Sequence, residues 1–126
     1  MLGEKEENDV EVTWDDQKNI NKFSRLHATF TDLEEEIHVL RREREDLDDL
    51  NVELELMDDE TIMYQIGDTY VNMTQSEALE QLEKDSKRAD EELERLQSRM
   101  SECEKGMSEL KVTLYARFGS NINLER

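Results

Sequence analysis

The sequence has no proline, only four glycines and few aromatic residues. Proline breaks helix interiors and glycine weakens them, so their scarcity favours long uninterrupted helices. Hydrophobic residues make up only 35% of the chain, below the roughly 45–50% of globular domains. That content is too low for a thick core but sufficient for a narrow apolar seam. With 126 residues, the chain predicts one domain at most.

A single cysteine, Cys103, excludes an internal disulfide framework and fits a reducing compartment. The first residues lack the apolar core of a secretion signal. No apolar run approaches the ~18 residues of a transmembrane helix. We therefore expect a soluble protein of the cytoplasm, with the nucleus left open as a second location.

Basic residues are too few for a partner that carries phosphate groups. Lys and Arg number 16 against 34 Asp and Glu, which gives a net charge of −18. Nucleic acids and anionic membrane surfaces both attract basic faces. We therefore expect neither as a partner.

Signs of catalysis are also missing. The sequence shows no nucleophile with a nearby base, no glycine-rich phosphate loop and no cluster of metal ligands. The two histidines, His27 and His38, lack a ligand spacing. We predict that the protein is not an enzyme and that it binds no cofactor and no metal.

What the chain does have is two long heptad patterns, from residue 14 to about 58 and from residue 75 to about 118. Such patterns are typical of coiled coils. The first has leucine at five successive d positions and is interrupted at a by Arg44 and Asn51. The second places Met100, Met107 and Cys103 in its seam, and a redox or intersubunit role for Cys103 is the alternative to packing. The d leucines of the first helix are Leu26, Leu33, Leu40, Leu47 and Leu54.

Capping residues mark the helix ends. Thr13 is suited to cap the first helix, with Asp15 and Asp16 in its first turn. Thr74 and Glu77 have the spacing of a capping box. Gly119 is placed to stop the second helix.

Between the helices lies the one strand-like stretch, about residues 61–73. Gly67 and Asp68 separate two apolar runs, as in a hairpin with a two-residue type II′ turn. Both faces carry apolar groups, and an isolated hairpin with open edges is marginally stable. We therefore predict that it pairs with other subunits. The predicted interface comprises Ile62, Tyr64, Ile66, Gly67, Tyr70, Val71 and Met73.

The two heptads also match each other. When they are laid antiparallel, facing residue numbers add up to one constant value whose midpoint falls between Ile66 and Gly67. The same register places Arg44 beside Ala89 and Asp16 beside Arg117. The sequence therefore predicts a mainly α fold: a long antiparallel two-helix coiled coil joined by one β-hairpin. Residues 13–119 form this domain, residues 1–12 a disordered acidic tail and residues 120–126 a short C-terminal tail.

Apolar residues gather where the free ends of the two helices meet, and we predict that this tip contacts unfolded polypeptides. Trp14 either packs there, which we favour, or contacts such clients. The acidic stretch 45–60 is interpreted as a solvated face, with docking of a basic partner as the alternative. The candidate tip residues are Ile20, Phe23, Tyr115, Phe118, Ile122 and Leu124.

Several motifs resemble the prefoldin family. Residues 64–68 (YQIGD) form the single hairpin of a β-class subunit, whereas the α class has two. Residues 12–17 (VTWDDQ), 20–23 (INKF) and 114–125 (LYARFGSNINLE) are similar to one eukaryotic β-class subunit. The resemblance covers nearly the whole chain beyond the first ten residues.

The resemblance implies a role as well as a fold. It implies an ATP-independent co-chaperone made of six different α- and β-class subunits. Such a complex captures unfolded actin and tubulin at its coiled-coil tips and delivers them to the cytosolic group II chaperonin. The alternative function is a structural coiled-coil adaptor or tether without chaperone activity.

Overall fold

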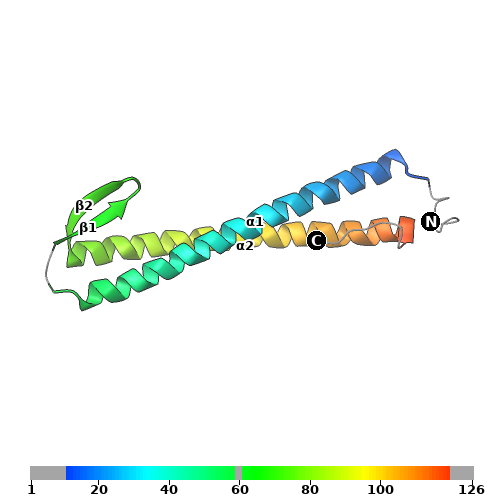
Figure 1. The fold of residues 1–126 in the computed structure, drawn as a ribbon. Coiled ribbons are helices and arrows are strands. Elements are labelled where there is room, and N and C mark those ends of the chain that lie inside the picture. Colours follow the sequence, from blue (N-terminus) through cyan, green and yellow to red (C-terminus); the bar gives the residue numbers. More distant parts are fainter. Residues whose placement is uncertain (1–10, 59–60, 120–126) are drawn as a thin grey trace. The chain divides into compact units, whose positions relative to one another are not determined.

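The computed structural model describes residues 11–58 and 61–119. Its elements follow the order helix α1 (Trp14–Leu56), strand β1 (Thr61–Ile66), strand β2 (Thr69–Thr74) and helix α2 (Gln75–Phe118) (Figure 1). The predicted mainly α fold with one hairpin is confirmed. The two predicted tails, residues 1–12 and 120–126, fall almost wholly outside the described residues.

The capping predictions hold at three helix ends. The Asp16 N–H donates to Thr13 Oγ1 at 3.1 Å at the start of α1, and the Glu77 N–H donates to Thr74 Oγ1 at 3.2 Å at the start of α2. The Glu77 carboxylate accepts in return from the Thr74 N–H, which completes the capping box. Gly119 has a φ of 62°, the left-handed conformation that ends many helices.

Helix α1 ends two residues before the predicted position, and Gln75 shows why. Its side-chain amide donates to the carbonyls of Leu54 at 2.5 Å and of Met57 at 3.1 Å. These carbonyls belong to the last turn of α1 and the residue after it, where backbone acceptors lack helical partners. The first residue of α2 thus caps the C-terminal end of α1.

The chain divides into two compact units. The terminal unit comprises Met1–Glu35 with Gln97–Arg126, and the hairpin unit comprises Glu36–Leu96. In the terminal unit Asp16 bonds to Arg117. Leu26 lies against Gly106, because a Cβ atom added to Gly106 would lie only 2.9 Å from Leu26 Cδ1. In the hairpin unit Arg44 bonds to Asp90, and the Leu54 carbonyl accepts from Gln75. Within each unit, therefore, the two helices run antiparallel in the predicted register.

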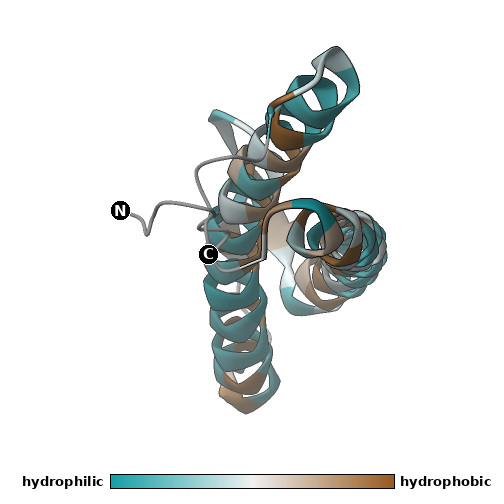
Figure 2. Ribbon diagram, turned by 90° about the vertical axis from the view of Figure 1, so that its right-hand side faces the viewer, coloured by the Kyte–Doolittle hydropathy of each residue, from teal (hydrophilic) through white to brown (hydrophobic). Residues whose placement is uncertain are grey.

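The core follows the heptads. Figure 2 shows both helices as mostly hydrophilic ribbons interrupted by hydrophobic segments, as a narrow apolar stripe requires. Other seam leucines, such as Leu40 and Leu93, are half-buried. The buried a and d residues are Phe23, Phe30, Leu33, Ile37 and Leu54 of α1, and Leu82, Ala89, Leu96, Cys103, Met107 and Leu114 of α2.

Strands β1 and β2 pair antiparallel, with Ile62 opposite Met73 and Tyr64 opposite Val71. Gly67 has a φ of 62°, while no other residue of the hairpin has a positive φ. A positive φ at the first turn position alone is the type II′ pattern, so the predicted turn is confirmed.

The base of the hairpin packs on the helices of its own unit. Tyr64 is 4% exposed and forms a buried cluster with Leu54, Ala78 and Leu82. Ala78 lies outside the a and d positions, and its small side chain leaves room for Tyr64 of the hairpin to pack against α2. In the part of the chain that the structure describes, neither helix is long and apolar enough to cross a membrane.

Candidate protein-binding surfaces

The hairpin offers two kinds of surface. Near its turn, Ile66 and Val71 are 42% and 39% exposed, and on the opposite face Met63 and Tyr70 are 59% and 58% exposed. These residues belong to a two-stranded sheet whose outer edges are not paired within the described chain. Apolar side chains beside open strand edges are suited to pairing with other strands.

Tyr64 behaves differently from the rest of the predicted interface. Its ring is buried within its own unit, and its hydroxyl donates to Asp85 Oδ2 at 2.9 Å. Burial, and then the neighbouring Asp85 carboxylate, raise the pKa of Tyr64 well above its ordinary value. Ile62 and Met73 are half-buried against the same cluster. Tyr64 therefore anchors the hairpin to the helices, which leaves Ile66, Tyr70 and Val71 as the exposed side chains of the predicted interface.

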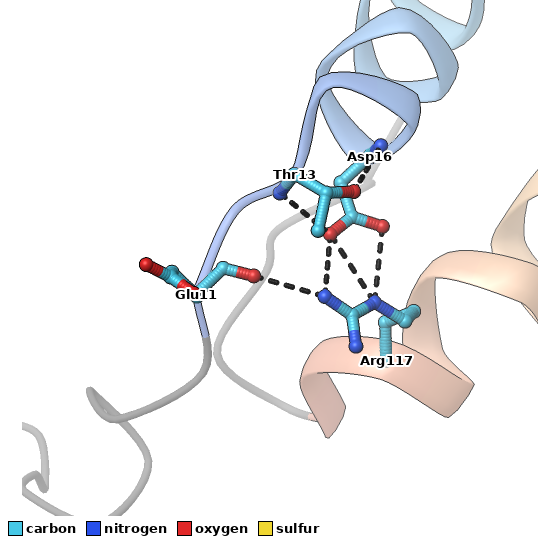
Figure 3. A network of polar contacts seen from close by, with 4 residues as sticks. All are labelled: Glu11, Thr13, Asp16 and Arg117. Atoms are coloured by element: carbon cyan, nitrogen blue, oxygen red, sulfur yellow. Dashed lines mark hydrogen bonds and ion pairs between the residues drawn. The ribbon is translucent and has the colours of Figure 1, made fainter.

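A polar network joins the start of α1 to the end of α2 (Figure 3). Asp16 lies at its centre. The Arg117 guanidinium donates to Asp16 Oδ2 at 2.6 Å and, through Nε, to Asp16 Oδ1 at 3.0 Å. Arg117 also donates to the Glu11 carbonyl at 2.9 Å. The Thr13 N–H donates to Asp16 Oδ2 at 3.0 Å, so a single carboxylate caps α1 and pairs with α2.

Asp16 is 4% exposed although it is charged. The hydrogen bonds from Arg117, followed by those from Thr13, hold the pKa of the Asp16 carboxyl far below its ordinary value. A buried carboxylate is tolerated when it is paired and hydrogen-bonded, as this one is. The sequence register predicted the pair, and the structure confirms it.

The predicted tip residues fall into three groups. Phe23 and Phe118 are buried, at 5% and 9% exposure, and Ile20 is half-buried. These three side chains therefore contribute mainly to the interior of the terminal unit. Tyr115 is exposed at 43%. Ile122 and Leu124 lie outside the described residues.

Other apolar residues of the terminal unit are more exposed than those predicted. Val12, Trp14 and Val112 are 54%, 73% and 72% exposed. The interpretation of Trp14 as a packing residue is therefore wrong. Trp14 occupies the first position of α1, outside the a and d positions of the seam, and Val112 likewise lies away from the seam at heptad position f. An apolar residue at the outward-facing f position could have identified Val112 as an exposed apolar residue from the sequence.

The described residues include no group of three His, Cys, Asp or Glu side chains arranged to hold a metal ion. Cys103 is a buried free thiol. The described surface carries exposed apolar side chains on the two strands and at the terminal ends of the two helices, in a chain with a net charge of −18.

Comparison with known proteins agrees with the fold. The family model described as "Prefoldin subunit" matches residues 17–121. Prefoldin subunit 4 of Saccharomyces cerevisiae is 41% identical over 127 residues, which cover 100% of this chain and 98% of the relative. Prefoldin subunit 4 of Homo sapiens is 44% identical over 119 residues, 93% of this chain and 89% of the relative. The probable prefoldin subunit 4 of Drosophila melanogaster is 31% identical over 118 residues, 93% and 86% of the two chains.

Proposed function

The chain belongs to the prefoldin subunit family, and we propose that it works as one subunit of a heterohexameric, ATP-independent co-chaperone. In this role it captures unfolded or nascent actin and tubulin and delivers them to the cytosolic group II chaperonin. Its place of action is the cytoplasm. Its partners in the hexamer are other prefoldin subunits of the α and β classes.

The hairpin supports the assembly step. Its exposed residues Met63, Ile66, Tyr70 and Val71 lie on both faces of a sheet of only two strands. A two-stranded sheet gains stability when further strands extend it or cover it. Strands of neighbouring subunits would form hydrogen bonds with the open edges and would cover the apolar faces.

The main support for client capture is the exposed apolar surface of the terminal unit. Trp14, Val112 and Tyr115 are 73%, 72% and 43% exposed, and the Asp16–Arg117 network holds the start of α1 against the end of α2. A non-native polypeptide exposes apolar side chains, which would find partners here. The net charge of −18 would keep the loaded protein soluble.

A triple variant, Trp14→Ser with Val112→Ser and Tyr115→Ser, tests this proposal. In a hexamer that contains it, we expect the suppression of aggregation of denatured actin to fall by roughly one sixth, because apolar contact area is lost at one of six coiled coils. The matched control is Val39→Ser with Val52→Ser, since these residues are 45% and 55% exposed but lie in the hairpin unit. Equal suppression by wild type and triple variant would refute client capture by this surface.

The alternative of a passive tether is less well supported. A tether that dimerises along its helices leaves its seam open to another chain. Here the seam is occupied within the chain, as the Arg44–Asp90 and Asp16–Arg117 bonds indicate. We therefore retain the chaperone role as the proposal.

A further inference from the structure

The seam of the hairpin unit is interrupted where polar or small residues replace apolar ones. Arg44 and Asn51 of α1 occupy a positions, and Ser86 of α2 occupies another. Together with neighbouring side chains they line a groove of about 590 Å³ between the two helices. The groove lies beside the hairpin but is formed by α1 and α2, so it is separate from the predicted strand interface.

The groove combines an apolar part with acidic walls. Leu82 is almost fully buried, whereas Leu79 is only half-buried and keeps part of its side chain open. Carboxylates line both helices along the groove: Asp48 and Glu55 on α1, Glu80 and Glu83 on α2. A ligand in this groove would contact leucine and carboxylate side chains together.

One cation of the groove is already engaged. The Arg44 side chain donates to Asp48 at 2.6 Å and to Asp90 at 2.8 Å, and these bonds raise its pKa above the ordinary value. In contrast, Glu55, Glu80 and Glu83 are exposed and make no ion pair with any described residue. Three carboxylates that line the groove are therefore not held in an ion pair by any of the described residues.

We propose that this groove docks a cationic amphipathic helical segment of another protein. Apolar side chains of the segment would cover Leu79, and its lysines or arginines would pair with Glu55, Glu80 and Glu83. Residues 76–86 of α2 extend about 15 Å at 1.5 Å per residue, which accommodates roughly three helical turns of a partner. Amphipathic helices bind in such grooves through anchors on one face, and complementary charge favours the correct partner.

The test uses the full-length chain co-expressed with the prefoldin subunits it assembles with. The probe is a fluorescent helical peptide with leucines on one face and lysines on the other, and its affinity is measured by anisotropy. For Glu80→Lys with Glu83→Lys, we expect the Kd to rise about tenfold. The milder Glu80→Gln with Glu83→Gln should give a smaller rise in the same direction.

The matched control is Glu91→Lys with Glu94→Lys. These residues have the same spacing on α2, are exposed, and change the net charge by the same amount, but they do not line the groove. We expect this variant to bind the peptide like wild type. Equal weakening by both Lys pairs would mean diffuse attraction to an acidic protein and would overturn the proposal, as would binding that no groove variant changes.

A second peptide separates the two parts of the recognition. It has the same composition, but its leucines and lysines are scrambled so that no apolar face forms. Docking in the groove predicts clearly weaker binding of the scrambled peptide, because Leu79 would stay uncovered. Equal binding of the two peptides would contradict an amphipathic partner.

Discussion

At the scale of single residues, the Asp16 carboxylate performs two tasks. It accepts from the Thr13 N–H as a helix cap and from the Arg117 guanidinium as an ion-pair partner. Its register position predicted the pair with Arg117. Its burial at 4% exposure was not predictable, because burial at a helix end depends on how closely the two helices approach there.

The lowered pKa of Asp16 makes the stability of the terminal unit dependent on pH. A carboxyl whose pKa is lower in the folded than in the unfolded chain stabilises the fold at pH values above its ordinary pKa, which is 3.8 for Asp. It loses this contribution as the pH falls toward the lower pKa of the folded chain. We expect the wild type to lose more stability than Asp16→Asn between about pH 5 and pH 2. Urea unfolding followed by circular dichroism measures the difference.

Asp15→Asn is the control for this pH experiment, because Asp15 is exposed in the same helical turn. Its stability should follow the wild-type pH profile. Identical profiles for wild type and Asp16→Asn would show that the Asp16–Arg117 pair contributes nothing to stability.

Leu114 provides a second prediction at this scale. It is 0% exposed in the terminal unit, so Leu114→Ala should cost about 2–5 kcal/mol through lost burial and a residual cavity. Val112→Ala, two residues earlier and 72% exposed, should change the free energy of unfolding by no more than about 0.5 kcal/mol. Chemical denaturation of both variants checks the contrast, and similar losses would place Leu114 outside the core.

At the scale of elements, the hairpin was the most predictable part of the chain. Gly67 and Asp68 between two apolar runs fixed the turn type, and strand alternation fixed which residues share a face. The sequence did not show that one face of the hairpin is divided: Tyr64 packs on the helices, whereas Ile66 and Val71 on the same face stay exposed. Tyr64 packs on Leu54 and Leu82 because Ala78 leaves room for it, and such a contact between distant segments is not encoded in either strand.

Assembly can be tested at the hairpin itself. Ile66→Asp with Val71→Asp places two charges on exposed apolar positions near the turn, so association with other prefoldin subunits should be lost while helix content is kept. Co-purification followed by mass measurement of the complex reads this out. Val39→Asp with Val52→Asp, at similarly exposed sites on α1, should assemble normally. An intact complex from the hairpin variant would exclude strand pairing as the means of assembly.

At the scale of the whole molecule, the heptads predicted that the chain folds back on itself. The contacts within each unit agree: Asp16 with Arg117 and Leu26 beside Gly106 in one, Arg44 with Asp90 in the other. The exposed apolar residues were less predictable. Trp14 and Val112 lie outside the repeating seam positions, so the periodicity that located the core had no information on them.

The register predicts an intrachain crosslink. In a Cys103→Ser background, Leu40→Cys with Leu93→Cys should form a disulfide within one chain, because both residues are half-buried in the hairpin unit at facing seam positions. Leu40→Cys with Leu79→Cys is the control, since residue 79 lies about 21 Å from residue 93 along α2. Non-reducing electrophoresis distinguishes a fast-migrating monomer from a crosslinked dimer. Dimers alone would refute the intrachain pairing.

The bond between Asp16 and Arg117 spans 101 positions of the sequence. During synthesis, α1 therefore leaves the ribosome long before the part of α2 that covers its beginning has been made. Until then Phe23, which is buried in the finished protein, is not covered by α2. A newborn copy of this prefoldin subunit thus passes through a stage in which the apolar stripe of α1 is not yet covered by α2.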